Sequence, residues 1–420
     1  MKLITTSSRT AQSRLEAFFA RREQSWTRAL PQAQRIVSAI RKGGDPALRR
    51  FATRLDRLPS HSSLRISEAD ISAAWAEAPA SLKDALHSAA RNIRAFAKRQ
   101  LPKEWSFAPT PGLCVGQLTR PLEAVGCYVP GGRYPLPSTL LMTVIPAQVA
   151  GVRRIAVTSP RPAPETLAAA AMLGVTEFYR IGGAHAIAAL AYGTDSISSV
   201  DKIVGPGNAY VTAAKKLVAL DCAIDMLAGP TEIVVASDSG NPRWIAADLV
   251  AQSEHDPDTL ALFVTTSATV ARAVIAEVKQ QSLPNPIARE ALRNNGYAIV
   301  ARSAEEAREI VNRLAPEHLT VDSESDLAWI RNVGSVFIGP CSAQPLGDYI
   351  SGPNHTLPTS ALARVRGGLS VSDFLKVITV QQYTPAALHK LGPAAITLAE
   401  AEGLRGHAAA IRARLEDANA

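Results

Sequence analysis

The sequence predicts an α/β protein that contains two doubly wound domains and ends in a small helical extension. Its 420 residues are 47% hydrophobic, which is enough to bury more than one core. Short apolar runs alternate with helical stretches in two successive blocks, residues 128–228 and 229–361. This alternation is typical of parallel sheets covered by helices. Glycines gather after the strand-like runs, where a sheet of this class approaches its ligand.

The first quarter of the chain is polar and is predicted to be helical. We expect an N-terminal helical segment over residues 1–24, and a further helical segment over residues 25–127 that packs with the second α/β domain. Apolar residues recur at three- and four-residue spacing over 31–41 and 80–99, as on one face of a helix. A proline-rich stretch at 101–112 indicates a connector.

The two blocks predict their strands and helices by the same signals. In the first block we expect strands at 154–159, 175–181 and 200–204, with helices at 164–173, 184–192 and 208–220. In the second block we expect strands at 232–236, 260–265, 297–301 and 335–338, with helices at 242–254, 269–280 and 304–314. Prolines and an asparagine N-cap at helix starts, and glycines after helix ends, support these boundaries. The remaining residues, 362–420, form the predicted C-terminal helical region.

Composition and charge exclude several classes of function. The formal net charge is +8, but the basic residues are interspersed with acidic ones. This is typical of an ordinary solvated surface, so we expect no nucleic-acid partner. No apolar stretch approaches the ~18 residues of a membrane helix, so we expect no membrane partner, and the N-terminus carries no secretory signal. The four cysteines show no CxxC spacing, which favours reduced thiols in a cytoplasmic protein.

Glycine motifs indicate a nucleotide-like ligand. They stand at residues 130–132, 182–183, 205–207 and 229–230, after or within strand-like runs. One such motif alone would be an ordinary turn, but their repetition favours close approach of the backbone to a ligand. A GxGxxG fingerprint that opens a helix is missing, so a standard dinucleotide site is not predicted.

His255, His407 and Asp348 are candidate ligands of a zinc ion. Gln252 and His255 are three residues apart near the end of a predicted helix, so their side chains point the same way. Imidazole nitrogens together with a carboxylate oxygen suit Zn²⁺. These residues are far apart along the chain, and each histidine taken alone is more often an ordinary core or surface residue. The residue types alone therefore do not decide whether these residues form a metal site.

Glu317 and His318 form an adjacent acid–base pair just after a predicted helix. A carboxylate and an imidazole are the commonest general bases near neutral pH. Adjacent side chains of an extended chain point opposite ways, so the two groups would serve two different proton transfers unless the backbone turns. The alternative is a helix-terminal surface pair with no chemical role.

Taken together, these motifs resemble the histidinol dehydrogenase family. The similarity extends over roughly residues 10–415, and the matching strings occur in the family's order. They are residues 126–132 (GCYVPGG), 182–193 (GGAHAIAALAYG), 200–210 (VDKIVGPGNAY), 228–232 (AGPTE), 252–255 (QSEH), 315–320 (APEHLT), 347–358 (GDYISGPNHTLP) and 402–407 (EGLRGH).

The resemblance implies a fold and an activity. The family has two Rossmann-like domains that lack the GxGxxG fingerprint. It oxidises L-histidinol to L-histidine in two NAD-dependent steps through L-histidinaldehyde, as the final step of histidine biosynthesis. It is a homodimer with one Zn²⁺ per subunit, and the C-terminal region, here residues 362–420, reaches the partner subunit.

The resemblance also implies site residues. The proton-transfer pair would be Glu317 and His318. The implied zinc ligands are Gln252, His255, Asp348 and His407, and the implied NAD contacts are Tyr128, His185 and Asn208. The implied substrate contacts are Thr231, Gln252, His255, His318, Asp348, His355, Glu402 and His407. Glu402 and His407 would come from the partner subunit.

Some positions depart from the family pattern. His185 stands where the family usually has Gln, and Thr231 where it usually has Ser. Relatives with the same zinc and NAD machinery oxidise other small polar alcohols, such as sulfonated diols, and this remains the alternative function. Glu402 favours the amino alcohol, because a carboxylate attracts a cationic amine and repels a sulfonate. A non-catalytic binding protein is disfavoured because every implied ligand and base is present.

Overall fold

The computed structural model describes residues 1–7, 13, 26–131 and 134–417 of the chain. The chain forms two compact units, a larger one from residues 1–100 and 123–374 and a smaller one from residues 101–122 and 375–420. Most of the predicted N-terminal helical segment lies outside the described residues. Its first residues are not helical, because Lys2–Thr5 form strand β1.

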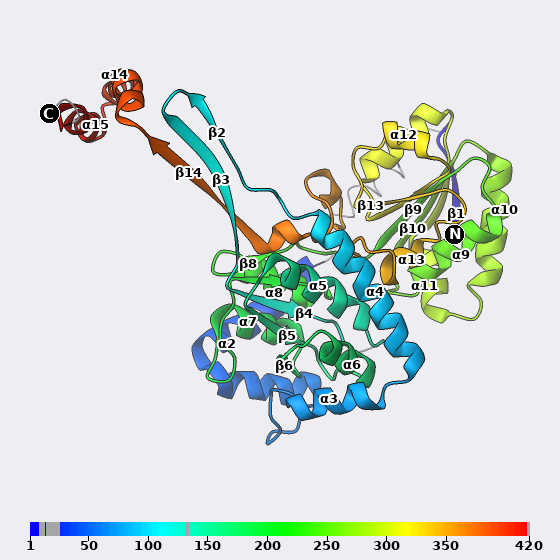
Figure 1. Ribbon diagram of the computed structural model, residues 1–420. Coiled ribbons are helices and arrows are strands. Elements are labelled where there is room, and N and C mark those ends of the chain that lie inside the picture. Colours follow the sequence, from blue (N-terminus) through cyan, green and yellow to red (C-terminus); the bar gives the residue numbers. More distant parts are fainter. Residues whose placement is uncertain (8–12, 14–25, 132–133, 418–420) are drawn as a thin grey trace. The chain divides into compact units, whose positions relative to one another are not determined.

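The larger unit contains a five-stranded parallel sheet with the strand order β6-β5-β4-β7-β8 (Figure 1). Its strands are β4 (Ala124–Tyr128), β5 (Arg154–Thr158), β6 (Glu177–Tyr179), β7 (Lys202–Val204) and β8 (Ala223–Ile224). Its helices are α5 (Pro137–Ala150), α6 (Pro164–Met172), α7 (Gly183–Tyr192) and α8 (Ala209–Val218). The strand order reverses between β4 and β7, and sheets of this class form their ligand crevice at the carboxyl ends of strands at such a point.

A six-stranded parallel sheet follows, with the strand order β1-β11-β10-β9-β12-β13. Its further strands are β9 (Glu232–Ala236), β10 (Leu260–Thr265), β11 (Gly296–Val300), β12 (His318–Val321) and β13 (Ser335–Ile338). Its helices are α9 (Pro242–Ser253), α10 (Ala268–Gln281), α11 (Pro286–Asn295), α12 (Ala304–Leu314) and α13 (Gln344–Tyr349). The elements predicted for both blocks are confirmed, and with them the α/β class. No bounds were predicted for strands β1, β4, β8 and β12 or for helices α5, α11 and α13.

In the described part of the N-terminal region, three helices pack on the helices of the five-stranded sheet. They are α2 (Leu30–Phe51), α3 (Glu68–Glu77) and α4 (Ala80–Arg99). Helix α2 packs on α7 and α8, α3 on α6, and α4 on α5. The expectation that residues 25–127 pack with the second α/β domain is therefore wrong.

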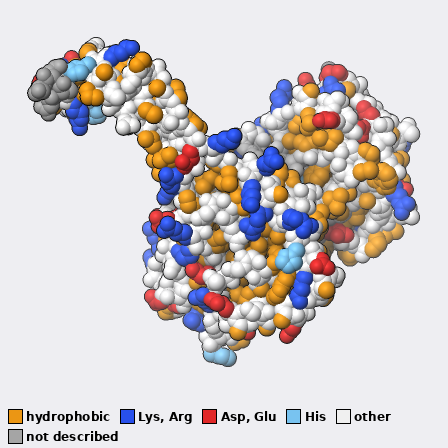
Figure 2. Space-filling view, in the orientation of Figure 1, with side chains coloured by type: hydrophobic (Ala, Val, Ile, Leu, Met, Phe, Trp, Pro, Cys, Tyr) orange, Lys and Arg blue, Asp and Glu red, His pale blue; other side chains and the backbone are white. Residues whose placement is uncertain are grey.

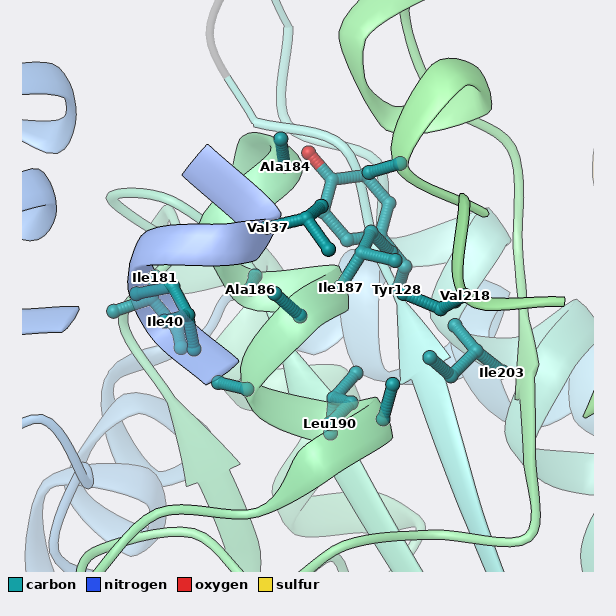
Figure 3. Close-up of a cluster of buried hydrophobic side chains, with 14 of the residues drawn as sticks. Val37, Ile40, Tyr128, Ile181, Ala184, Ala186, Ile187, Leu190, Ile203 and Val218 are labelled. Carbon is teal, nitrogen blue, oxygen red and sulfur yellow. The ribbon is translucent and has the colours of Figure 1, made fainter. Parts of the chain in front are cut away.

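The packing of α2 has a physical reason in helix α7. The residues of α7 from Ala184 to Ala191 are all buried, so this helix needs apolar cover on the side that faces away from its sheet. Helix α2 supplies that cover through an apolar stripe that includes Val37 and Ile40, which belong to the same buried cluster as Ile187 and Leu190 of α7 (Figure 3).

The smaller unit contains a three-stranded antiparallel sheet with the order β14-β3-β2. It consists of β2 (Trp105–Thr110), β3 (Leu113–Pro121), β14 (Leu375–Tyr383), α14 (Pro385–Ala401) and α15 (Arg405–Asp417). Two expectations are corrected here. The supposed connector at 101–112 contains strand β2, and the predicted helical region at 362–420 contains strand β14 between its 3₁₀ turns and its helices. Both strands carry mostly exposed side chains, so neither shows the polar–apolar alternation of a half-buried strand.

Short helical turns complete the described structure. They are the 3₁₀ turns Thr27–Ala29, Glu324–Ala328, Leu362–Arg364 and Val371–Phe374, and the π-helical turn Ala52–Asp56. Within the described ranges, no helix combines the length and the apolar character needed to cross a bilayer. On the face shown in Figure 2, Lys and Arg side chains lie in several separate groups among acidic and uncharged ones.

Candidate functional site

A cavity of about 560 Å³ in the larger unit is lined by residues of both α/β regions. The five-stranded sheet contributes the loops that follow β4 and β7, at the carboxyl ends of its strands. The six-stranded sheet contributes Thr231, Glu317 and His318, at the amino ends of β9 and β12. Opposite ends of the two sheets thus meet at one cavity.

The wall from the five-stranded sheet includes glycine backbone. A Cβ at Gly131 would lie 2.2 Å from the carbonyl oxygen of Pro160, and one at Gly205 would lie 2.1 Å from that of Tyr128. Gly205 also has φ +113°, a conformation that side chains rarely adopt. These two glycines are required by close packing against the chain's own backbone, whereas the approach to a ligand that the glycine motifs predicted stays a prediction.

Asn208 follows this loop and caps helix α8. Its Oδ1 accepts hydrogen bonds from the backbone N–H groups of Tyr210 and Val211, at 3.0 and 3.2 Å. The side-chain oxygen is therefore committed to the helix. The amide nitrogen is the part of this cavity-lining side chain that can donate to a ligand.

Glu317 is buried and anchored to the neighbouring strand. Its Oε2 accepts hydrogen bonds from the Thr231 hydroxyl at 2.5 Å and from the backbone N–H of Glu232 at 2.9 Å. Burial raises the pKa of Glu317 to about 7, although His318 and these two hydrogen bonds act in the opposite direction. A carboxyl group with this pKa can take up or release a proton near neutral pH.

His318 is buried beside Glu317 and lines the same cavity. Its Nδ1 lies 3.2 Å from the backbone oxygen of Glu232 and 3.7 Å from Glu317 Oε2. Its Nε2 is buried without a hydrogen-bond partner and lies 3.6 Å from Asp348 Oδ1. Burial alone would lower the pKa of His318, but Glu317 and Asp348 outweigh it and raise that pKa. The adjacent pair therefore reaches one cavity and is not a surface pair.

Three of the candidate zinc ligands line this cavity, namely Gln252, His255 and Asp348. Gln252 lies in the last turn of helix α9. It donates from Nε2 to Asp348 Oδ2 at 3.3 Å, while its Oε1 is buried without a hydrogen-bond partner. Burial lowers the pKa of His255, which keeps its imidazole neutral and able to bind a metal. Burial would raise the pKa of Asp348, but His318 lowers it overall.

Asp348 and His355 are held by further contacts. The fully buried Gln344 donates from Nε2 to Asp348 Oδ2 at 3.3 Å. His355 places Nδ1 2.7 Å from the backbone oxygen of Asp348 and Nε2 3.2 Å from the hydroxyl of Thr139 on α5. Burial lowers the pKa of His355. Neither Gln344 nor Thr139 was singled out in the sequence, although Gln344 stands four residues before Asp348, the spacing of neighbours on a helix.

Comparison with known proteins identifies the family. The chain matches the histidinol dehydrogenase family model over residues 19–415. The histidinol dehydrogenase of Gluconobacter oxydans is 45% identical over 428 residues, which cover 99% of this chain and 100% of that protein. The chain belongs to the histidinol dehydrogenase family. The histidinol dehydrogenase of Geobacillus kaustophilus is 47% identical over 393 residues, 91% of this chain and 92% of its own.

A solved structure agrees with this assignment. The crystal structure of histidinol dehydrogenase from Elizabethkingia anophelis matches with a TM-score of 0.89 at 36% identity, over 93% of each chain. As a member of the histidinol dehydrogenase family, the chain is an oxidoreductase.

Two of the NAD contacts implied by the histidinol dehydrogenase resemblance are buried and are not among the residues that line the cavity. Tyr128 accepts a hydrogen bond at its hydroxyl from the backbone N–H of Gly183 at 3.1 Å. His185 is 1% exposed and places Nε2 2.7 Å from Oδ2 of Asp56, which also accepts from the N–H of Gly182 at 3.0 Å. Both residues support the glycine turn at 182–183. Of the three implied NAD contacts, Asn208 lines the cavity.

The other residues implied by the resemblance belong to the smaller unit. Glu402 is the C-cap of α14 and His407 lies in the first turn of α15, and both are exposed. Neither is among the residues that line the cavity. Within the described ranges, no three His, Cys, Asp or Glu side chains form a group that could hold a metal ion. In the larger unit, His255 and Asp348 are the only implied ligands of those types.

Proposed function

We propose that this chain catalyses the NAD-dependent oxidation of L-histidinol to L-histidine through L-histidinaldehyde, the final step of histidine biosynthesis. One observation carries the proposal. The buried Glu317–His318 pair shares a cavity with Gln252, His255 and Asp348. Membership of the histidinol dehydrogenase family supports the same substrate and disfavours the alternative of another small polar alcohol.

The two adjacent bases suit two proton transfers. In the first oxidation, His318 takes the hydroxyl proton of histidinol while the carbon-bound hydrogen leaves as hydride to NAD. In the second, Glu317 takes a proton from water, the resulting hydroxide adds to the aldehyde, and hydride leaves to a second NAD. The products are the carboxylate and two NADH. The pKa of about 7 of Glu317 matches this role near neutral pH.

The residues of the cavity fit a zinc ion. The buried Oε1 of Gln252 has no hydrogen-bond partner in the protein, as expected of an oxygen that serves as a ligand to a metal ion. With the imidazole of His255 and the carboxylate of Asp348 it forms a mixed nitrogen and oxygen donor set, which suits Zn²⁺. We propose His407 of a second copy as the fourth ligand of the one Zn²⁺ in each site. Bound there, the ion supplies a template that holds the imidazole and amine nitrogens of the substrate.

NAD is proposed to bind against the loops that follow β4 and β7. The amide of Asn208 and the bare backbone at Gly131 and Gly205 border the cavity and allow close approach of the cofactor. Tyr128 and His185 are proposed to act indirectly, because their polar atoms hold the turn at 182–183.

A homodimer is proposed because Glu402 and His407 belong to the smaller unit. That unit exposes large apolar side chains on its sheet, among them Trp105, Phe107 and Val377, and Figure 2 shows apolar side chains on its surface. Exposed apolar patches mark association surfaces. A second copy is the occupant that would also complete the site. The free thiols of Cys114, Cys127, Cys222 and Cys341 support a cytoplasmic location.

The test is NAD reduction by the purified, zinc-loaded protein with L-histidinol. We expect two NADH for each histidinol consumed, as the four-electron reaction requires, and L-histidine as the product. A zinc-loaded protein that binds NAD and leaves histidinol unchanged would contradict the proposal. Anionic diols would then be the first alternative substrates to measure.

A further inference from the structure

We propose that the buried ion pair of Lys215 and Asp225 is a positioning element that fixes the loop at residues 205–208 for the dinucleotide. The inference deepens the NAD-dependent function proposed above and rests on it. The loop connects the carboxyl end of β7 to helix α8 and lines the cavity through each of its residues. Nothing in the sequence motifs indicated what holds it.

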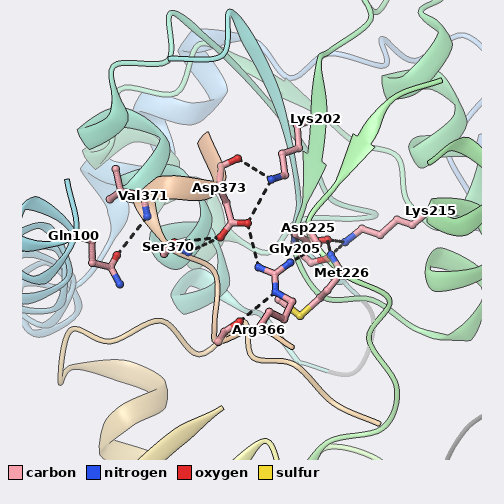
Figure 4. A network of polar contacts seen from close by, with 11 residues as sticks. Gln100, Lys202, Gly205, Lys215, Asp225, Met226, Arg366, Ser370, Val371 and Asp373 are labelled. Carbon is pink, nitrogen blue, oxygen red and sulfur yellow. Dashed lines mark hydrogen bonds and ion pairs between the residues drawn. The ribbon is translucent and has the colours of Figure 1, made fainter. Parts of the chain in front are cut away.

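Both members of the ion pair form hydrogen bonds with the backbone of Gly205 (Figure 4). Lys215 of α8 and Asp225 after β8 are almost fully buried, and their Nζ and Oδ1 atoms are 2.6 Å apart. The N–H of Gly205 donates to Asp225 Oδ2 at 2.7 Å, and the carbonyl oxygen of Gly205 accepts from Lys215 Nζ at 2.5 Å. Each charged partner therefore fixes one of the two peptide groups that flank the same residue.

Further contacts fix Asp225 itself. Its Oδ1 accepts from the backbone N–H of Met226 at 2.6 Å. Arg366 donates to the backbone oxygen of Asp225 and pairs with Asp373 at 3.1 Å. Lys202 of β7 donates to the backbone oxygen of Asp373 at 2.7 Å. The carboxylate that holds the loop is thus held on several sides.

The loop needs these contacts because its own residues do little to stabilise its conformation. Gly205 adopts φ +113°, which only a glycine takes readily, and Pro206 has no N–H to donate. Without the ion pair, this backbone would be free to leave the conformation that leads into the N-cap Asn208. A preformed loop lowers the entropy that a ligand loses on binding.

The charges of the pair are matched to an anionic ligand. Asp225 lines the cavity, and an unpaired carboxylate there would repel the pyrophosphate of a dinucleotide. The ammonium group of Lys215 neutralises it. Stability alone does not explain the pair, because replacing a buried ion pair by neutral residues of similar volume is often harmless to stability. The two bonds to Gly205 give it a function that apolar residues would lack.

The test compares NAD binding with folding. Single substitutions leave one buried charge unpaired and are expected to unfold the protein, so the variant of choice is Lys215→Met with Asp225→Asn, which removes both charges. We expect a melting temperature within about 5 °C of the wild type, and a Kd and KM for NAD raised about tenfold. The kcat at saturating NAD and the KM for histidinol should change by less than about twofold, because Glu317 and His318 are held by the backbone of Glu232 and not by this loop.

A matched control is Arg154→Met with Glu177→Gln. This pair joins β5 and β6 of the same sheet at 3.3 Å, and neither residue lines the cavity. We expect its Kd for NAD to equal that of the wild type. An equal loss of NAD affinity in the control, or wild-type affinity in the folded double variant, would overturn the inference. A wild-type protein that does not bind NAD would overturn the proposed function as well.

Hydrogen exchange tests the inference without any substitution. If the pair preforms the loop, the amides of Gly205 and Met226 exchange slowly in the wild-type protein before NAD is added. Fast exchange that slows only with NAD would show that the cofactor orders the loop, and the inference would be wrong.

Discussion

The two parallel sheets of the larger unit contribute to the cavity in opposite ways. The five-stranded sheet presents the carboxyl ends of β4 and β7, with glycine backbone and the capping residue Asn208. The six-stranded sheet presents the amino ends of β9 and β12, with Thr231, Glu317 and His318. One sheet offers shape and the other offers groups that exchange protons. Similar strand orders thus serve different tasks because different ends of the strands are used.

The difference follows from what holds each group. In the six-stranded sheet, His318 is in register with Ile233 of the adjacent strand β9, so Glu317 stands beside Glu232 and accepts a hydrogen bond from its backbone N–H. Strand pairing therefore fixes the acid–base pair directly. In the five-stranded sheet, a buried ion pair fixes a loop outside the strands.

The largest effect is expected from the acid–base pair. His318→Asn removes a general base and should lower kcat by about 10²–10⁴-fold, while zinc content and NAD binding stay at wild-type values. Glu317→Gln should still release the first NADH when the aldehyde is trapped, because only the second oxidation needs it. Rapid-quench product analysis separates the two steps. A wild-type kcat for His318→Asn would contradict the proposal that the six-stranded sheet supplies the general base.

A smaller effect is expected at the metal candidates of the six-stranded region. Gln344→Leu removes the hydrogen bond to Asp348 Oδ2 and should weaken zinc binding about 10–100-fold, as measured by competition with a chelator. His255→Ala removes an implied ligand and should lower the zinc affinity further. Both variants should bind NAD normally. Zinc affinity equal to that of the wild type in His255→Ala would exclude this metal site.

Substitutions at Asn208 test whether the region of the five-stranded sheet binds NAD. Asn208→Asp keeps the oxygen that caps α8 but removes the amide donor and adds a negative charge, so NAD affinity should fall about tenfold with stability retained. Asn208→Ala should lose the cap as well, at a cost of about 1 kcal/mol in the free energy of unfolding. Calorimetric titration with NAD and chemical denaturation measure the two quantities. If Asn208→Asp binds NAD as well as the wild type, the amide is not a cofactor contact.

The smallest effect is expected at Thr231. Its hydrogen bond stabilises the charged form of Glu317 and lowers the pKa of that carboxyl group. Thr231→Val should therefore raise that pKa above its value of about 7. Glu317 would then stay protonated to higher pH, and the acid limb of the kcat profile would move to higher pH. Thr231→Ser keeps the hydroxyl and should leave the profile unchanged. An acid limb that moves to lower pH in Thr231→Val would mean that the hydrogen bond does not stabilise the charged form of Glu317.

The sequence predicted the fold class well where a buried strand is a continuous apolar run in the chain. Strands such as β5 and β10 are short apolar runs between helices, and that signal does not depend on distant contacts. Strand β12 was missed because it is brief and opens with a polar residue, His318. Strands β2 and β14 were missed because their side chains are mostly exposed, so no alternation marks them.

Some residues of the candidate site could be predicted from the sequence and others could not. Glu317, His318 and the cavity-lining ligand candidates were identified by their residue types and by the family resemblance. Gln344, Asp56 and the pair of Lys215 and Asp225 were not, because their roles depend on partners that only the folded chain brings close. His185 shows the limit most clearly. Its motif suggested a cofactor contact, but its Nε2 faces Asp56 in the interior.

Strand β1 has a consequence for the order in which the chain folds. Residues 2–5 pair in parallel with residues 297–300 at the edge of the six-stranded sheet, so this strand pairs with a partner nearly 300 positions further along the chain. Such distant pairing is slow to form, and until it forms β11 presents an open edge to other chains. We therefore expect deletion of residues 1–6 to lower the yield of soluble protein in rapid expression more than it lowers the activity of the molecules that do fold.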